Sequence, residues 1–434
     1  MADSAVKAWL ARQAYSLALR LGTPLYLWRV WSRGRKEPDY RLHWPERLGC
    51  HKGPTQPPGW VWVHAVSLGE ARAAEPLIAA LRAQLPGMRL LLTHTTATGR
   101  EAGQRLLQHG DVQTWLPFDT PGAVRRFLRH FRPAAGVLME TEVWPNLMYE
   151  ARRLRVPMVL ANARLSPKSL RQGQRFAALL RPAAQALSET LAQTDDDAAR
   201  LRTMGAEPVQ VCGNVKFDMS PAPALLALGQ RWRQADVRPL CLAASTREGE
   251  EAGLLGAWLA QAPEASPKVP RLWLVPRHPE RFDEVAALLA QRGLRVSRRS
   301  AWPDGQPDAE ALAADVWLGD TLGEMPAYYA AATLAWLGGS FAPLGGQNLI
   351  EAAACACPLV MGPSTYNFDE AATLSLAAGA ARRASGWPDA VRQAHQWLRE
   401  GTDAAQRNAL AFAQQNQGAS SRMAQRVIRV MLTP

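Results

Sequence analysis

The chain has 434 residues, a length that predicts two domains. Hydrophobic residues make up 47% of it and charged residues 20%, ordinary globular values that exclude a wholly disordered chain and a polytopic membrane protein. Lys and Arg outnumber Asp and Glu by 50 to 38, and the net charge of +12 suits an acidic partner such as nucleic acid or an anionic membrane surface.

The excess charge is concentrated at the amino terminus. Residues 1–36 hold seven basic side chains and one acidic side chain, so they carry half of the net charge of +12. The longest charge-free run there, residues 21–28, is too short to span a hydrocarbon core, which needs about 20 residues. No long apolar stretch with a small-residue cleavage site follows, so a cleavable signal peptide is not expected.

Wound as a helix, this segment is amphipathic. Its apolar face holds Leu10, Ala14, Leu17 and Leu21. Its polar face holds Arg12, Gln13, Ser16 and Arg20. Tryptophans near both ends suit the headgroup region of a bilayer, and the basic run 29–36 suits anionic lipid. We therefore expect a helix lying in a membrane interface; packing on its own protein and a nucleic-acid arm are the alternatives.

From residue 60 onward, short runs rich in Val and Leu alternate with helical patterns, which predicts parallel sheets built from βαβ units. Strands are expected at 60–66, 89–94, 135–140, 157–162, 190–194 and 209–213, and, after a break near 220, at 239–245, 271–276, 315–320, 333–339 and 358–362. Helices are expected at 70–84, 100–108, 145–154 and 408–431. The pattern predicts two doubly wound α/β domains with an interdomain cleft.

Ligands of such sheets bind beyond the carboxyl ends of the strands, so polar residues there are the candidates for chemistry. In the first half these are Ser67, Gly69, Glu70, Glu140, Glu142, Asn162, Arg164, Ser166 and Lys216. Glu70 opens a helix, where a carboxylate either complements the helix dipole or serves as a general base. The cations are either ion-pair partners or contacts for a carboxylate or phosphate substrate.

The second half repeats this arrangement. Its candidates are Arg277 and His278 after one strand, Gly323, Glu324 and Met325 after another, and Gly345, Gly346, Gln347, Asn348 and Glu351 at a further helix start. Backbone N–H groups at such starts suit phosphate, and a nearby Glu suits ribose hydroxyls. Neither G-x-G-x-x-G nor a P-loop occurs, which disfavours those nucleotide sites. Five cysteines without a C-x-x-C pair argue against a structural zinc site.

Eight motifs occur in the order and spacing of 3-deoxy-D-manno-octulosonic acid (Kdo) transferases, which the chain resembles over nearly its whole length. The motifs are HAVSLGE, METEVWPN, NARLS, GNVKFD, ASTREGEE, VPRHPERF, GDTLGEM and GGSFAPLGGQNLIEAAA. WSRGRK resembles the end of the family's basic, membrane-attached amino terminus. Where the family commonly has GGHN, this chain has GGQN, and Gln347 can hydrogen-bond but cannot carry a charge.

The resemblance implies a GT-B glycosyltransferase that moves Kdo, with inversion and without a bound metal or cofactor, from CMP-Kdo to the lipid A precursor lipid IVA. It implies a location on the cytoplasmic side of the inner membrane of a Gram-negative bacterium. The expected parts are an amphipathic membrane-anchoring segment (1–36), an acceptor-binding domain (37–219), a CMP-Kdo-binding domain (220–407) and a carboxyl-terminal helix (408–434) packing back across the domains.

The resemblance also implies roles for individual residues. Glu70 would be the base, and Glu140 and Lys216 would stabilise the transition state. The CMP contacts would be Pro276, Arg277, His278, Gly323, Glu324, Met325, Asn348, Leu349, Ile350 and Glu351. The other first-half candidates would contact the acceptor.

Two alternatives belong to other classes. One is another GT-B enzyme that uses a UDP-sugar, but the motifs around Glu140 and Asn162 argue against it. The other is a non-enzymatic protein of membrane surfaces or nucleic acid, which explains the charge but not the polar residues at strand ends. Because the charge gathers in an amphipathic segment, we expect a membrane partner and no nucleic acid.

Overall fold

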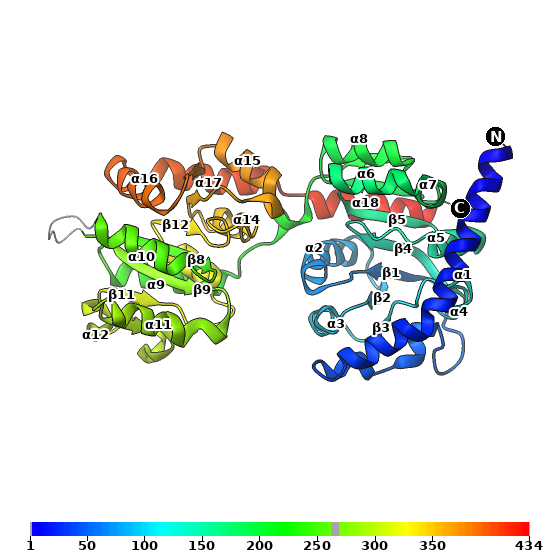
Figure 1. Cartoon of the computed structure of the whole chain (residues 1–434), viewed down its shortest axis with the longest axis horizontal. Helices are drawn as coiled ribbons and strands as arrows, with labels where there is room; N and C mark the ends of the chain where they lie inside the picture. The colour runs from blue at the N-terminus through cyan, green and yellow to red at the C-terminus, as the bar shows by residue number, and fades with distance from the viewer. Residues whose placement is uncertain (1, 262–268, 434) are drawn as a thin grey trace. The chain divides into compact units, whose positions relative to one another are not determined.

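The computed structural model describes residues 2–261 and 269–433. The chain forms two compact units, which are described separately (Figure 1). The first unit comprises the chain up to Asp218 together with the chain from Gln417 onward, and the second comprises Met219–Asn416.

The first unit is built on a seven-stranded parallel sheet with the order β3-β2-β1-β4-β5-β6-β7. Its strands are β1 (Trp60–His64), β2 (Arg89–His94), β3 (Val112–Trp115), β4 (Pro133–Met139), β5 (Met158–Ala163), β6 (Glu189–Ala192) and β7 (Val209–Val211). Most of their side chains are buried on both faces, which explains their continuous apolar runs.

Helices cover both faces of this sheet. They are α2 (Leu68–Gln84), α3 (Ala97–Gln104), α4 (Pro121–Phe131), α5 (Pro145–Arg153), α6 (Pro167–Arg175), α7 (Ala177–Ala184), α8 (Asp195–Met204) and α18 (Ala419–Leu432). One core joins α2 and α18 to side chains such as Val63 and Val137. The other joins α4, α5, α7 and α8 to Trp62 and Leu138. Alternate residues of each strand thus feed opposite cores.

The second unit has the same plan, with a parallel sheet ordered β10-β11-β9-β8-β12-β13-β14. Its strands are β8 (Leu240–Thr246), β9 (Arg271–Pro276), β10 (Val296–Arg298), β11 (Val316–Leu318), β12 (Leu334–Leu337), β13 (Leu359–Met361) and β14 (Ala381–Arg383). Its helices are α9 (Pro223–Ala235), α10 (Glu250–Ala260), α11 (Phe282–Gln291), α12 (Ala309–Ala313), α13 (Met325–Ala331), α14 (Leu349–Ala354), α15 (Asp369–Ala377), α16 (Trp387–Glu400) and α17 (Asp403–Gln415).

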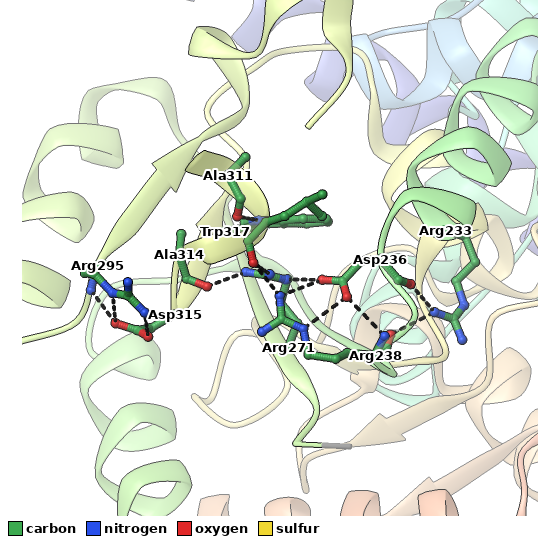
Figure 2. A network of polar contacts seen from close by, with 10 residues as sticks. Arg233, Asp236, Arg238, Arg271, Arg295, Ala311, Ala314, Asp315 and Trp317 are labelled. Atoms are coloured by element: carbon green, nitrogen blue, oxygen red, sulfur yellow. Dashed lines mark hydrogen bonds and ion pairs between the residues drawn. The ribbon is translucent and has the colours of Figure 1, made fainter. Parts of the chain in front are cut away.

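A buried ion network ties together the amino ends of three strands in the second unit (Figure 2). Arg271 is fully buried, and its guanidinium pairs with Asp236 and donates to the carbonyls of Leu312 and Ala314, each at 2.7 Å. Arg238 donates to the same Asp236 carboxylate at 3.0 Å. Because these groups satisfy one another, the network is structural, and it lies at the sheet edge opposite the expected donor residues.

Three short strands were not expected from the sequence: β3, β10 and β14. They read VQTW, VSR and ARR, and all lie at or next to a sheet edge. Edge strands bury less surface, so their sequences lack the continuous apolar run that marks central strands. The expected single helix over 408–434 also differs, because α17 ends at Gln415 and α18 begins at Ala419. These two helices belong to different units.

The amino-terminal segment is one long helix, α1 (Ala2–Arg33). It packs on the first unit through a mixed side that includes Arg12, Ser16 and Val30, whereas Gln13 and Arg20 of the expected polar face are exposed. Ser16 Oγ donates to Asn146 Oδ1 at 2.9 Å, and the Arg12 guanidinium lies 3.5 Å from the centre of the Tyr149 ring. The apolar face is uncovered: the side chains that are more than half exposed include Val6, Trp9, Leu10, Leu17, Leu21, Leu25 and Trp28. No helix within the described ranges is long and apolar enough to cross a membrane.

Candidate functional site

Glu70 lies in the first turn of α2, directly after β1. Ser67 caps this helix, accepting a hydrogen bond from the Glu70 backbone N–H at 3.4 Å. The Glu70 carboxylate accepts a hydrogen bond from the Val66 N–H at 2.9 Å through Oε2, while Oε1 has only a 3.5 Å contact with the Ser67 hydroxyl. One carboxylate oxygen is therefore anchored and the other is largely available.

The pKa of Glu70 is raised to about 7, and burial is the largest cause. The negative charges of Glu142 and Glu140 contribute to this increase, and the hydrogen bond from the Val66 N–H opposes it. A carboxylate with this pKa is ionised in a large fraction of molecules near neutral pH and is still basic enough to accept a proton.

Glu140 and Asn162 end strands β4 and β5, and both have left-handed backbones, with φ of 58° and 51°. This conformation costs about 1 kcal/mol or more for a residue with a side chain, and such residues gather at functional sites. Glu140 is buried, and its Oε2 accepts a hydrogen bond from Nε of the exposed Arg164 at 2.8 Å. Arg164 Nη2 lies 2.7 Å from the same oxygen, so the ion pair holds one side of the Glu140 carboxylate beyond the end of the sheet.

Lys216 lies on the short helix η3 (Val215–Asp218), at the same edge of the sheet. Burial lowers the pKa of its ammonium group, and the charges of Glu140 and Glu70 counteract that effect. The charges of Glu140, Arg164 and Glu70 all act on Lys216, which indicates that these four side chains lie near one another at this edge of the first unit.

A chain of side-chain amides holds the Lys216 segment in place. Asn162 is fully buried; its Oδ1 accepts from the Val215 N–H at 3.2 Å, and its carbonyl accepts from Gln193 Nε2 at 2.8 Å. Gln193 Oε1 in turn accepts from Asn214 Nδ2 at 3.0 Å, and Asn214 Oδ1 accepts from the Lys216 N–H at 3.0 Å. Asn162 therefore acts as a support for the Lys216 segment, a role that the sequence did not suggest.

Gln193 was missed by the sequence reasoning. Its position directly after β6 is the signal that could have found it, since the other strand-end polar residues were chosen on that ground.

The remaining first-half candidates have mixed surroundings. Glu142 is partly buried and accepts a hydrogen bond from Trp144 Nε1 at 3.0 Å, and burial raises its pKa. Gly69 is exposed in the first turn of α2. The Ser166 hydroxyl caps α6 by accepting from the Ser169 N–H at 3.1 Å, which gives it a structural task.

In the second unit, the expected donor residues gather at the carboxyl edge of the other sheet. Arg277 is exposed directly after β9, and Glu324 before α13 pairs with Arg299 at 2.8 Å. Asn348 caps α14 through the Ile350 N–H at 3.1 Å. Leu349 and Ile350 have buried side chains, so only their backbones are available to a ligand.

Glu250 shapes the glycine-rich loop after β12. Its buried carboxylate accepts hydrogen bonds from the Gly339 N–H at 2.8 Å, the Phe341 N–H at 3.1 Å and the Ala342 N–H at 3.2 Å. The backbone around it leads to Gly345 and Gly346, whose φ values of 82° and 74° favour glycine. Glu250 belongs to the ASTREGEE motif, but its role becomes visible only in the folded chain.

Taken alone, the first unit presents a basic carboxylate next to a second carboxylate and two cations, which suits deprotonation of a hydroxyl and stabilisation of negative charge. Within residues 2–261 and 269–433, no group of three His, Cys, Asp or Glu side chains is placed to bind a metal ion.

Solved structures share this fold. A UDP-GlcNAc 2-epimerase from Neisseria meningitidis matches with a TM-score of 0.54 and 14% identity, covering 86% of this chain and 100% of that chain. A glycosyltransferase from Rickettsia africae matches with a TM-score of 0.55 and 11% identity, covering 86% and 99%. At these identities the likeness concerns the fold alone: paired Rossmann-like domains with parallel sheets, as in GT-B proteins.

Sequence comparison is more specific. The family profile of 3-deoxy-D-manno-octulosonic-acid transferase (kdotransferase) matches residues 42–219. A 3-deoxy-D-manno-octulosonic acid transferase from Bordetella pertussis is 50% identical over 398 residues, which is 89% of this chain and 90% of the relative. Another from Haemophilus influenzae is 34% identical, covering 82% and 83%.

The relatives define an enzyme of the glycosyltransferase class, and the fold agrees with that class. Within that class, the chain belongs to the Kdo transferase family. The resemblance read from the eight motifs is thereby confirmed, and the UDP-sugar and non-enzymatic alternatives are not supported.

Proposed function

We propose that this enzyme transfers Kdo from CMP-Kdo to lipid IVA, with inversion at the anomeric carbon. In this reaction an acceptor hydroxyl oxygen forms a bond to the anomeric carbon of Kdo, the bond from that carbon to the phosphate oxygen breaks, and CMP leaves. The proton of the acceptor hydroxyl goes to a general base. Family membership supports Kdo transfer, and the carboxylate site of the first unit supports this assignment of steps.

The observation that carries the proposal is the Glu70 carboxylate. Its Oε2 is held by the Val66 N–H, its Oε1 is largely available, and its pKa of about 7 suits a base near neutral pH. An ordinary capping glutamate on a solvent-exposed turn would be neither partly buried nor within the influence of two further carboxylates.

Glu140 and Lys216 complete the proposed machinery. Lys216 would stabilise the negative charge that develops on the leaving phosphate, and Glu140 would keep Lys216 charged despite its burial. Arg164 would hold Glu140 in place and add positive charge for the carboxylate of Kdo or a phosphate of the acceptor. The proposal assigns no step to a metal ion or another cofactor.

The second unit would bind the CMP part of the donor. Side-chain contacts would come from Arg277 and His278 after β9, and further contacts from the segment 323–325. The glycines Gly345 and Gly346 would let the backbone approach the ligand closely. Pro276, Leu349 and Ile350 are buried, so they would contribute shape and backbone groups. Asn348 and Glu351 would form hydrogen bonds with the ribose hydroxyls.

We also propose that the protein works at the cytoplasmic surface of the inner membrane, where its lipid acceptor is found. Support comes from α1, whose apolar face is uncovered while the side that holds Arg12 and Ser16 packs on the first unit. A helix packed only for stability would bury its apolar side. Anionic membrane lipid would then neutralise the basic run 29–36.

The test is incubation of the full-length protein with CMP-Kdo and lipid IVA, with the products resolved by mass. Wild type should add Kdo, while Glu70→Gln should lower kcat by about 100-fold or more and still bind CMP-Kdo, because a general base contributes roughly that factor. Glu75→Gln, at an exposed position five residues further along α2, is the matched control and should keep full activity. Near wild-type turnover of Glu70→Gln would remove Glu70 as the base.

A further inference from the structure

A basic pocket lies at the amino edge of the first sheet, opposite the edge that carries Glu70. Its cavity has a volume of about 700 Å³. The lining includes Ala134, Pro157, Ser188 and Pro208, which stand at or just before the starts of β4, β5, β6 and β7. The catalytic assignments above use none of these residues.

Arginines give the pocket its charge. Arg152 and Arg155 line it from the end of α5 and the turn that follows, and Arg429 lines it from α18. All three side chains are exposed and have no hydrogen bond or ion pair to the described part of the chain. A fourth, Arg426, is neutralised by the buried Glu189. The pocket therefore keeps three uncompensated positive charges over a lining that also contains Val156, Val430 and Met431.

The amino-terminal part of α1 runs in the direction of this pocket. Ser16 contacts Asn146 and Arg12 contacts Tyr149, so α1 runs antiparallel to α5. Residues of α1 before Arg12 continue toward the end of α5, where Arg152 lines the pocket. Trp9, more than half exposed, lies in that part of α1. An apolar surface next to unpaired arginines has the chemistry of a lipid interface, where acyl chains and phosphates adjoin.

We propose that this pocket binds the phosphate headgroup of an anionic membrane phospholipid, which fixes the orientation of the first unit on the bilayer. The ligand class follows from the three free guanidinium groups, which recognise phosphate oxygens, and from the aliphatic floor, which suits the glycerol end of a lipid. This inference rests on the membrane location proposed above. It adds a specific site, distinct from the catalytic edge, to the general attraction of a basic protein to a membrane.

A purely structural role makes a different prediction. Arg152 and Arg429 lie in the last turns of their helices, where arginines complement the helix dipole. In that case, neutralising them would lower the thermal stability of the first unit and leave lipid binding unchanged.

The test is flotation of the full-length protein with vesicles made of equal parts phosphatidylglycerol and phosphatidylcholine. The triple variant Arg152→Gln, Arg155→Gln, Arg429→Gln should bind these vesicles about 100-fold more weakly, which corresponds to about 1 kcal/mol for each arginine. Its melting temperature and its weak binding to pure phosphatidylcholine vesicles should match those of wild type. The matched control is Arg292→Gln, Arg399→Gln, Arg407→Gln, which removes the same charge from exposed positions of the second unit and should bind like wild type.

Four results would overturn the proposal. In the first, the pocket variant binds the vesicles as well as wild type does, and in the second, the control variant loses as much binding as the pocket variant. In the third, the three arginines affect the binding of inorganic phosphate but not the binding of the vesicles. In the fourth, the pocket variant loses transfer to lipid IVA in detergent, which would assign the pocket to the acceptor. The assay in detergent also separates this proposal from the proposed function. If the wild-type protein shows no transfer in detergent, the proposed function is refuted, while the vesicle experiment still decides whether the pocket binds a headgroup.

Discussion

At the scale of residues, the central feature is a carboxylate whose basicity depends on its neighbours. Burial is the largest cause of the raised pKa of Glu70, and Glu142 and Glu140 add to it through their negative charges. Lys216 has the opposite balance, because burial lowers its pKa while the charges of Glu140 and Glu70 sustain its positive charge. Glu140 therefore influences both the base and the lysine, whereas Glu142 acts on Glu70.

The pH dependence of transfer should report this coupling. Below a pH of about 7 the Glu70 carboxyl is mostly protonated and cannot accept a proton, so kcat/KM should fall as the pH drops through this value. Glu142→Gln removes a negative neighbour and should move the acid limb to lower pH, which pH–rate profiles of the two proteins measure. An acid limb that stays in place in Glu142→Gln would contradict the coupling.

The amide chain behind Lys216 gives a second prediction at this scale. Gln193→Met removes the hydrogen bonds to the Asn162 carbonyl and to Asn214, which loosens the segment that holds Lys216. We expect kcat to fall about 10- to 100-fold with little change in KM, since small misplacements of a catalytic group have effects of this size. Steady-state kinetics measures both constants.

The same substitution at Gln210, an exposed residue of β7, is the control and should leave both constants unchanged. An unchanged kcat in Gln193→Met would show that the amide chain does not position Lys216.

At the scale of elements, α1 is unusual because a row of large apolar side chains, from Val6 to Trp28, is turned away from the protein. Tyr15 donates to the buried Asp119 at 3.0 Å, and Tyr26 stacks on Phe118 with ring centres 4.3 Å apart. Removing the whole helix would therefore uncover part of the first unit. A loss of membrane binding could then come either from the missing anchor or from a less stable first unit. A substitution on the outward face avoids this problem.

Leu21→Glu tests the outward face directly. Leu21 is 73% exposed, so a charge there should not disturb the fold, but burying it in a bilayer would become unfavourable. Binding to phosphatidylglycerol-containing vesicles should weaken about 10- to 100-fold, which corresponds to the roughly 1.5–3 kcal/mol of a buried leucine. Val237→Glu, on an exposed turn of the second unit, is the control. Equal binding by Leu21→Glu and wild type would refute insertion of this face.

At the scale of the whole molecule, the chain returns to its first unit at the end. Helix α18 follows the second unit in sequence, but Met423 and Val427 complete the core beside α2. Asp218 accepts hydrogen bonds from the Gly418 and Ser420 N–H groups, which fastens the start of α18 to the end of the first unit. The stability of the first unit therefore depends on residues more than 200 positions away.

Met423→Ala should destabilise the first unit by about 2–5 kcal/mol, because it leaves a cavity in a fully buried site. Hydrogen exchange should show faster exchange in β1 and β4 and no change in β8 and β9. Gln425→Ala, on the exposed side of α18, should change stability by no more than about 0.5 kcal/mol. Faster exchange confined to β8 and β9 would contradict the assignment of α18 to the first unit.

The sequence by itself determined the two parallel sheets and the polar residues at their carboxyl edges, since both follow from local patterns: apolar runs mark central strands, and charged residues follow them. The tertiary structure decided which face of α1 is covered, which unit owns α18 and how Gln193 supports Lys216. These depend on contacts such as Ser16 with Asn146 and Arg426 with Glu189, 130 and 237 positions apart. Hydrophobic periodicity shows that a helix has two faces, but only its packing partners select which face is buried.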